Sequence, residues 1–326
     1  MSQVVIAGGS GYLGRALAAR LAREGHQVVV LTRAGGTSSK LEVRPVRRSL
    51  GEGGSSKSEA PSRIRYAEWT PDGTAGPWAE EVAAADAVVN LAGAGIADKR
   101  WTESRKRLLV DSRIMSTRSL VAAIRGAEKR PSLFVQASGI GYYGSYEDGP
   151  ALNESSAPGH DFLADLCVAW EGEAQPVQAF DCRLVTIRSG IVLSKDGGAL
   201  KKMTLPFKFF AGGPLGSGRQ QMSWIHRDDW IGLVAWTIRL PLVTGVINAT
   251  APNPVPNWEF SRILGRAMRR PSWAPVPGFV LKLVVGEMAE VALLRGQRVL
   301  PARAQELGFA FRYPELKAAL AAEFAV

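Results

Sequence analysis

The sequence contains little cysteine and little histidine. Cys167 and Cys182 are the only cysteines, and His26, His160 and His226 are the only histidines, in 326 residues. Two thiols cannot build a disulfide framework or a cysteine zinc cluster, and they suit a reducing compartment. Three scattered imidazoles form no ligand pattern for a metal. We therefore expect neither a structural disulfide nor a metal site.

Long apolar runs are also missing. The most apolar late stretch, residues 279–294, is interrupted by Lys282, Glu287 and Glu290, whereas a membrane-spanning helix needs about 20 apolar residues. The first apolar segment begins almost at Met1, which leaves no room for a secretory signal. We therefore expect a cytoplasmic protein without a membrane partner.

Acidic residues are fewer than basic ones, 30 against 40, so the formal net charge is +10. About half of the excess lies in residues 33–65, and no recognised nucleic-acid motif accompanies it. A charge run of this kind is usually a solvated face. We expect a small-molecule substrate rather than a nucleic acid, and the sequence leaves open whether the chain forms an oligomer.

The first fourteen residues combine a short apolar run with regularly spaced glycines. Residues 3–7 are rich in β-branched side chains, which predicts a buried strand, and leucines at four-residue spacing after residue 12 predict a helix. A glycine-rich turn between a strand and a helix N-terminus presents backbone N–H groups to a dinucleotide pyrophosphate. The predicted cofactor contacts in this turn are Gly8, Ser10, Gly11, Tyr12, Leu13 and Gly14. The alternative is an ordinary strand–turn–helix.

The second predicted strand, residues 27–31, ends in Thr32 and Arg33. An NAD-specific site would place an acidic residue here to hold the ribose hydroxyls, and none is present. The Arg33 guanidinium suits a 2′-phosphate instead, which favours NADP(H), with Thr32 beside it. The alternative is that Arg33 only faces solvent.

Strands and helices alternate through the first half of the chain. Further strands are expected at residues 64–69, 86–91, 132–137 and 183–188, with helices at 101–125 and 160–174. This alternation predicts an α/β fold, a Rossmann-type doubly wound parallel sheet, with a smaller C-terminal α+β substrate region. We divide the chain into 1–188 for the NADP-binding domain, with 34–63 as a mobile insertion, and 189–326 for the partly interleaved substrate region.

Several segments together resemble the extended short-chain dehydrogenase/reductases. Within that group the chain is most similar to the atypical, sugar-epimerase-like members of the NAD-dependent epimerase/dehydratase family, including the cell-division-inhibitor-like relatives. The segments that carry the resemblance are residues 8–14, 90–93, 138–144, 188–192, 212–220, 223–229, 296–301 and 308–309. Residues 34–63 depart from the pattern, because most relatives have only a short connection there.

The resemblance implies roles for residues outside the glycine turn. It places Leu91, Ala92 and Gly93 under the cofactor ribose and pyrophosphate, and Val192 beside the nicotinamide. It also places Arg113 so that it faces the cofactor site. Ser138 matches the catalytic Ser or Thr at the end of the fifth strand.

The catalytic Tyr-x-x-x-Lys pair of the active relatives is absent. When Glu171 is aligned with the glutamate of the family's helix, Leu163 and Cys167 occupy the two positions, and neither can act as general acid or base. Tyr142 and Tyr143, in the loop after Ser138, are the nearest phenols. They are our candidate proton donors, and the alternative is that both only pack over the cofactor.

The residues after 190 are expected to bind substrate. Arg219 and His226 are the candidate contacts, because basic groups suit a phosphate or carboxylate such as that of a nucleotide sugar. A structural role for His226 beside Asp228 and Asp229 is the alternative.

The sequence thus predicts an NADP(H)-binding oxidoreductase or epimerase-like enzyme for a small-molecule alcohol or carbonyl. A catalytically degenerate NADP(H)-binding sensor or regulatory protein is the rival hypothesis.

Overall fold

The computed structural model describes residues 2–33 and 63–325. The expected insertion at 34–63 therefore lies, except for its last residue, outside the described residues. Among the helices in the described ranges, none is long and apolar enough to cross a membrane.

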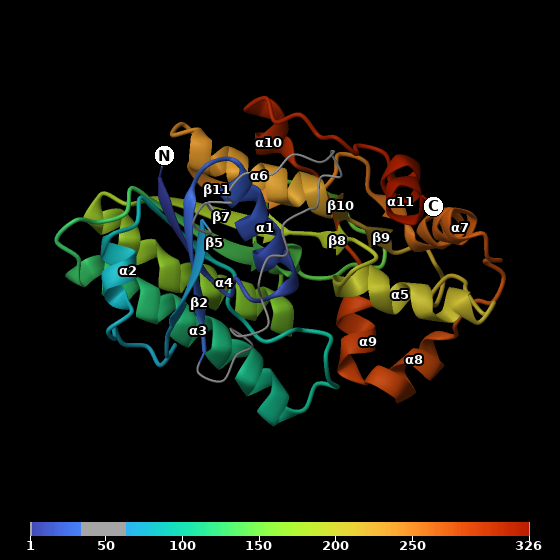
Figure 1. Ribbon diagram of the computed structural model, residues 1–326. Helices are drawn as coiled ribbons and strands as arrows, with labels where there is room; N and C mark the ends of the chain where they lie inside the picture. The colour runs from blue at the N-terminus through green and yellow to red at the C-terminus, as the bar shows by residue number, and fades with distance from the viewer. Residues whose placement is uncertain (1, 34–62, 326) are drawn as a thin grey trace, which may run out of the picture.

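A seven-stranded parallel sheet forms the centre of the molecule (Figure 1). Its strand order is β3-β2-β1-β4-β5-β7-β11, and every neighbouring pair is parallel. Its strands are β1 (Gln3–Ala7), β2 (Gln27–Thr32), β3 (Ile64–Glu68), β4 (Ala87–Asn90), β5 (Leu133–Gly139), β7 (Arg183–Ser189) and β11 (Gly245–Ala249). The predicted Rossmann-type α/β fold is confirmed.

The inner strands are buried on both faces, which explains their continuous apolar sequences. Successive side chains of β1 point to opposite sides of the sheet. Val4 and Ile6 join one apolar core, and Val5 and Ala7 join the other. All four side chains are fully buried.

Helices cover both faces of this sheet. Figure 1 shows α1 and α6 on one side and α2, α3 and α4 on the other. The flanking helices are α1 (Tyr12–Arg23), α2 (Ala79–Ala83), α3 (Glu103–Gly126), α4 (Phe162–Ala174), η3 (Gln175–Phe180, a 3-10 helix), α6 (Arg227–Arg239) and α10 (Ala302–Glu306). Because all seven strands are parallel, their carboxyl ends meet at one edge of the sheet, where the loops to the helices gather.

A smaller lobe lies beyond that edge and has its own apolar core, which includes Trp224, Phe260 and Leu320. Its elements are β8 (Ile191–Leu193), α5 (Gly198–Lys208), β9 (Gln221–Met222), β10 (Trp224–His226), β12 (Val255–Pro256), α7 (Asn257–Met268), α8 (Gly278–Val285), α9 (Glu287–Ala292) and α11 (Leu316–Phe324). A short pair, β6 (Ala151–Leu152) with β13 (Arg298–Val299), and the 3-10 turn η2 (Ile140–Tyr143) complete the fold.

The sheet has one strand more than the sequence predicts. β11 pairs with β7 through residues 245–249, far beyond the last predicted strand at 183–188. The chain leaves the sheet after β7, builds part of the smaller lobe, and returns through α6 to add this edge strand.

Candidate functional site

The glycine turn after β1 is shaped by close backbone contacts. Gly8 has a φ of +76°, and a Cβ on it would lie 2.7 Å from the Leu91 carbonyl carbon. A Cβ on Gly14 would lie 2.5 Å from the Gly9 Cα. Larger residues at either position would displace backbone, so the turn brings β1, α1 and the loop after β4 together only with glycine there.

Helix α1 begins directly at this turn. Its N-cap residue is Gly11, and no side chain in the described part of the chain caps the first N–H groups. The Gly11 N–H donates to the Gly8 carbonyl oxygen over 3.0 Å, which closes the turn. The unsatisfied N–H groups and the positive end of the helix dipole suit an anion such as a pyrophosphate.

The loop after β4 forms the opposite side of this anion-binding end. The Asn90 side chain is fully buried and donates to Thr117 Oγ1 and to Gln136 Oε1. Its carbonyl oxygen accepts from the Ala92 N–H over 3.1 Å. This buried polar network fixes the path of residues 91–93 over the strand ends.

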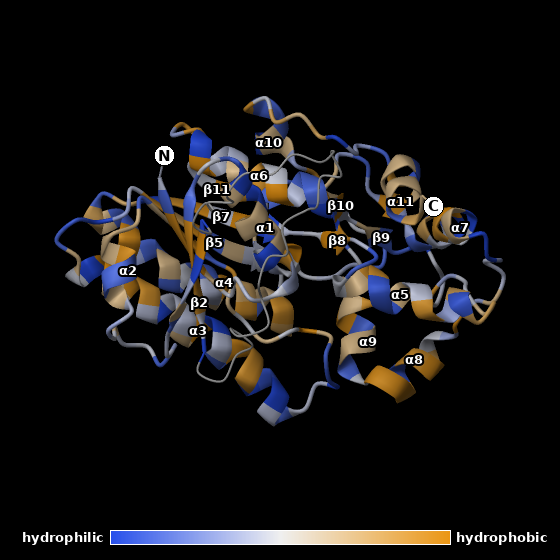
Figure 2. Cartoon of the chain, viewed as in Figure 1, coloured by the Kyte–Doolittle hydropathy of each residue, from blue (hydrophilic) through white to orange (hydrophobic). Residues whose placement is uncertain are grey.

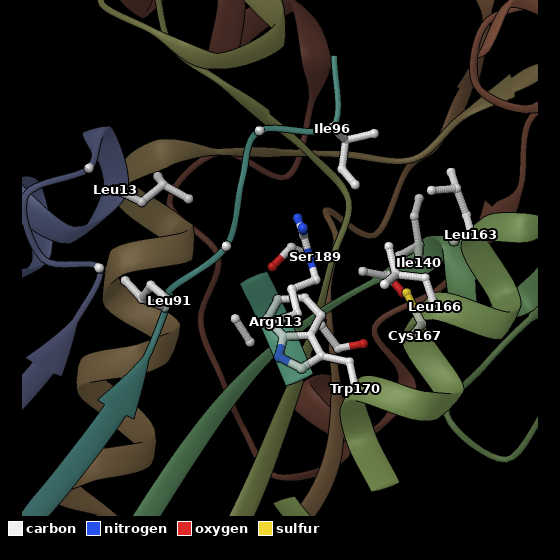
Figure 3. A pocket seen from close by; sticks show the side chains of 18 of the residues that line it. Leu13, Leu91, Ile96, Arg113, Ile140, Leu163, Leu166, Cys167, Trp170 and Ser189 are labelled. Carbon is white, nitrogen blue, oxygen red and sulfur yellow. The ribbon is translucent and has the colours of Figure 1, made fainter. Parts of the chain in front are cut away.

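A cavity of about 470 Å³ lies over the carboxyl ends of β1, β4, β5 and β7. Figure 3 shows Leu13 and Leu91 on one side of it and side chains of α4 on the other. Its walls are formed by Gly8, Gly11, Tyr12, Leu13, Gly14, Leu91, Gly93, Gly95, Ile96, Arg113, Ala137, Ser138, Gly139, Ile140, Gly141, Leu163, Leu166, Cys167, Trp170, Ser189 and Trp230.

Arg113 is the basic group of this cavity. Its side chain comes from α3 and is only 8% exposed, and Figure 3 shows it between Leu91 and the α4 side chains. Its guanidinium donates to the Leu109 carbonyl oxygen and lies 4.9 Å from the Trp170 ring, and no carboxylate in the described residues pairs with it. Burial lowers the pKa of Arg113 to about 10. A buried cation without an acidic partner indicates an anionic ligand.

Ser138 connects the cavity to a buried polar chain. Its hydroxyl donates to Glu171 Oε1 over 2.6 Å, and the Glu171 carboxylate accepts two bonds of 2.8 Å from Arg188. Arg188 also donates to the Tyr143 hydroxyl, which donates in turn to Asn248 over 2.7 Å. This hydrogen-bonded network therefore links β5, α4, β7, η2 and β11 below the cavity.

The two phenols after Ser138, Tyr142 and Tyr143, both contact Arg188 of this hydrogen-bonded network. Tyr143 is fully buried and does not line the cavity. Burial raises the pKa of Tyr143, although the neighbouring Arg188 opposes the shift. The Tyr142 ring lies 3.3 Å from the Arg188 guanidinium carbon and packs edge-on against Tyr143. Both rings hold Arg188 in place.

The α4 side of the cavity is mostly apolar. Leu163, Leu166, Cys167 and Trp170 recur at helical spacing and face the cavity. Burial raises the pKa of Cys167 to about 11, so its thiol is neutral at physiological pH. Neither of the side chains at the positions of the family's Tyr and Lys, Leu163 and Cys167, can exchange a proton near neutrality.

The structure brings half of the predicted site residues together. The predicted residues that line the cavity are Gly8, Gly11, Tyr12, Leu13, Gly14, Leu91, Gly93, Arg113 and Ser138. The predicted residues that do not are Ser10, Thr32, Arg33, Ala92, Val192, Tyr142, Tyr143, Arg219 and His226. Of these, Arg33 is exposed at the end of β2, which is hydrogen bonded to β1 beside the turn.

The predicted substrate contacts lie apart from the cavity. His226 is buried, its Nδ1 accepts from the Asp228 N–H, and its Nε2 lies 3.0 Å from a Glu323 carboxylate oxygen. Burial would raise the pKa of Glu323, but hydrogen bonding with His226 and from the Lys195 N–H, together with the charges of His226 and Arg227, lowers it overall. His226 thus caps α6 and anchors the C-terminal helix. Arg219 is exposed.

Sequence reasoning did not select Glu171 as a site residue. A carboxylate in an otherwise apolar helix face, four residues after Cys167, is the signal that could have found it, because a buried Glu needs a basic partner. The α4 residues of the cavity wall carry the i, i+3, i+4, i+7 spacing of one helix face. Ser189 and Trp230, whose side chains bond each other over 2.9 Å, had no local signal.

The parallel sheet, the glycine turn and the cavity over the strand ends define a Rossmann-type NAD(P)-binding protein. The chain belongs to the NAD dependent epimerase/dehydratase family, whose model matches residues 4–248. A second model, described as a domain of unknown function (DUF1731), matches residues 276–323. The predicted resemblance is therefore confirmed.

Three relatives illustrate the likeness. The chloroplastic SDR39U1 homolog of the epimerase family from Arabidopsis thaliana is 43% identical, over 98% of this chain and 86% of its own length. The structure of human epimerase family protein SDR39U1 with NADPH has a TM-score of 0.80 at 31% identity and covers 99% of both chains. The nucleoside-diphosphate sugar epimerase of Corynebacterium glutamicum has a TM-score of 0.72 at 29% identity, over 99% of this chain and 58% of that one.

Proposed function

We propose that this protein binds NADP(H) in the cavity over the strand ends and acts on a small-molecule alcohol or carbonyl, with a nucleotide sugar as the favoured substrate class. Arg113 carries the binding part of the proposal, because its buried guanidinium pairs with no carboxylate of the described residues and lies in the cavity that the glycine turn borders. The pyrophosphate of the dinucleotide would lie against the N-terminus of α1.

The residues present fit this cofactor. The close approach at Gly8 and Gly14 leaves backbone where side chains would otherwise block the pyrophosphate. The exposed Arg33 follows Thr32 at the end of β2, where a guanidinium would favour the 2′-phosphate of NADP(H) over NAD(H). The human relative SDR39U1 was solved with NADPH, which supports the same choice.

Ser138 is the group that would meet the reacting oxygen. When bound, NADP(H) supplies or accepts a hydride at its nicotinamide ring. Because the Ser138 hydroxyl donates its proton to Glu171, its oxygen is left to accept a hydrogen bond from a substrate hydroxyl. The name of the Corynebacterium relative, a nucleoside-diphosphate sugar epimerase, supports the substrate class.

The second candidate function is an NADP(H)-binding sensor or regulatory protein. The observation that favours it is the α4 wall, where Leu163 and the neutral Cys167 line the cavity and the phenol of Tyr143 is bonded away from it. Such a protein would keep cofactor affinity without turnover.

Cofactor choice is tested by calorimetric titration of the protein with NADPH and NADH. Charge-assisted hydrogen bonds contribute about 1.5–3 kcal/mol, so Arg33→Ala should weaken NADPH binding about tenfold or more and leave NADH binding unchanged. Arg23→Ala, at an exposed arginine of α1, is the matched control. Equal affinity of the parent protein for the two cofactors would contradict NADP(H) specificity.

Chemistry is tested with a panel of nucleotide sugars, quinones and small aldehydes, followed by the absorbance of the reduced nicotinamide. Ser138→Ala should lower turnover about 10²–10⁴-fold and leave NADPH affinity intact. Tight NADPH binding without turnover of any compound would favour the regulatory function.

A further inference from the structure

Two segments of the smaller lobe contain basic residues and no carboxylate. Residues 197–227 and residues 260–286 each contain five Lys or Arg and no Asp or Glu. They include α5, α8 and most of α7. In the structure, four of these ten cations pair with carboxylates of neighbouring segments: Lys202, Arg227, Arg262 and Lys282.

The two segments are in direct contact. Gly212 and Ser272 form an isolated parallel bridge, and the Trp273 indole N–H donates to the Phe210 carbonyl oxygen over 3.0 Å. The Arg270 guanidinium carbon lies 4.7 Å from the Phe210 ring. We call the surface formed by Lys208, Phe209, Phe210, Arg269, Arg270 and Trp273 the aromatic–basic face.

Large apolar side chains are exposed on these segments to an unusual degree. Seven of the twelve exposed large apolar residues of the described chain lie in them, including Phe209 at 75% and Trp273 at 70% exposure. Helix α8 follows within five residues of Trp273 and has no buried residue, with Phe279 and Leu283 both strongly exposed. Figure 2 shows α8 as an apolar helix at the surface of the smaller lobe. Exposed large apolar side chains gathered on two segments in contact, rather than scattered singly, mark an interaction surface.

The cations of the aromatic–basic face are free to meet a ligand. Within the described residues, no carboxylate forms an ion pair with Lys208, Arg269 or Arg270. Phe210 and Arg269 have φ angles of +59° and +55°, in the left-handed region that non-glycine residues seldom adopt. At Arg269 this conformation is the C-cap that ends α7.

We propose that the aromatic–basic face binds the surface of an anionic lipid bilayer. Lysine and arginine side chains bind anionic headgroups, and exposed aromatic and aliphatic side chains enter the boundary between headgroups and acyl chains. A second copy of this chain is disfavoured, because it would bring two carboxylate-free basic surfaces together. Neither cavity described in the structure is lined by these residues, so the face offers protruding side chains rather than a groove for a protein segment.

This association is peripheral. The sequence excludes a membrane span at residues 279–294 because charges interrupt it, and no described helix is long and apolar enough to cross a bilayer. The charges at Lys282, Glu287 and Glu290 exclude a span, but they do not exclude contact with the surface of a bilayer. Binding through side chains at the surface needs neither length nor an unbroken apolar run.

The test is co-sedimentation of the full chain with vesicles of phosphatidylcholine, with and without about one third phosphatidylglycerol. We expect binding only to the anionic vesicles, and loss of binding at about 1 M salt, where screening is strong. The double variant Lys208→Glu/Arg270→Glu should bind about a hundredfold more weakly or worse. Phe209→Ser should bind about tenfold more weakly.

Matched controls lie at the amino ends of the strands. Leu242→Ser removes a leucine that is 79% exposed, and Lys129→Glu reverses an exposed charge; both should bind as the parent does. Thermal melting and NADPH titration check that every variant is folded. Absence of binding to anionic vesicles at low salt would overturn the proposal, as would equal losses in the controls. Binding that survives both Phe209→Ser and Lys208→Glu/Arg270→Glu would also overturn it, because the contact with the bilayer would then lie on another surface.

Discussion

The glycine-turn side and the α4 side of the cavity differ in whether their polar groups already have hydrogen-bond or ion-pair partners. At the glycine turn, backbone N–H groups at the start of α1 face the cavity, and Arg113, beside Gly93 in the loop after β4, has no acidic partner among the described residues. At the α4 wall, the polar groups are already paired: Ser138 with Glu171, and Glu171 with Arg188. One end is thus prepared for an anion, and the other is stabilised by its own bonds.

This difference separates cofactor binding from proton transfer. Binding a dinucleotide needs a turn of the right shape and a cation, which a few glycines and one arginine supply. Proton transfer needs a group whose pKa lies near the working pH and which reaches the reacting atom. The described side chains that line the α4 wall include no such group, because Leu163 is apolar and the thiol of Cys167 is neutral. The two functions can therefore be broken independently.

The largest expected effect is on stability at the α4 end. Glu171→Ala would leave Arg188 buried and unpaired, because the side chains of this pair are only 9% and 4% exposed. Breaking a buried pair costs about 3–5 kcal/mol. Urea denaturation should show this loss, while NADPH affinity of the folded protein changes little.

Glu173→Ala is the matched control for that experiment. Glu173 lies on the same helix and pairs with Arg118 at the surface, where an ion pair contributes about 0–1 kcal/mol. Equal losses in the free energy of unfolding from the two variants would show that the buried hydrogen bonds of Glu171 do not stabilise α4.

The next largest effect is a loss of NADPH affinity when the glycine turn is displaced. A Cβ on Gly14 would meet the Gly8 oxygen at 2.6 Å and the Gly9 Cα at 2.5 Å. Gly14→Val should displace the turn and weaken NADPH binding more than about a hundredfold, the equivalent of two charge-assisted bonds. Gly172→Ala, at a helical glycine with nothing within 4 Å, should keep full affinity and stabilise the fold by about 0.5–1 kcal/mol. Calorimetry compares them, and unimpaired binding by Gly14→Val would refute the pyrophosphate assignment.

Much of the fold could be predicted because its signals are local. The buried β-branched runs indicated β1, β2, β4, β5 and β7, and the helix expected at 101–125 is α3, Glu103–Gly126. The strand β11 escaped prediction because it lies beyond residue 188, after the chain has built part of the smaller lobe, and pairs with β7 only when α6 brings it back to the sheet. Which edge a short apolar segment joins depends on tertiary packing.

The site residues likewise divide into those that a local sequence signal identifies and those whose role depends on distant partners. The glycine turn is a continuous segment, so its spacing identifies it. The role of Tyr143 depends on Arg188 and Asn248, far along the chain, and the role of His226 depends on Glu323 near its end. A single sequence carries no sign of which distant partner a polar side chain will find, so the same residues were equally good candidates for catalysis.

Replacing Arg113 should have a smaller effect, which weakens NADPH binding without lowering the stability of the ligand-free protein. Arg113→Met should weaken NADPH binding about tenfold to a hundredfold through loss of a charge-assisted contact. The ligand-free protein should become no less stable, because an apolar side chain replaces a buried unpaired charge. Arg118→Met, on the same helix but paired with Glu173 at the surface, should leave affinity unchanged. A loss of stability with full affinity would make Arg113 a structural residue.

The smallest effect concerns the Cys167 thiol and is confined to alkaline pH. Burial raises its pKa from an ordinary value of 9.0 to about 11 in the folded protein. Because a raised folded pKa favours the protonated form, the resulting stability is fully present below about pH 9 and is lost as the pH rises towards 11. The loss at the upper limit is on the order of 2 kcal/mol. Cys167→Ala should remove this component, so the two stability curves should converge above pH 9 and run parallel below it. Urea denaturation across this range measures the difference. Curves that stay parallel to pH 11 would show that the thiol is not held neutral, and the α4 wall would then contain an ionisable group after all.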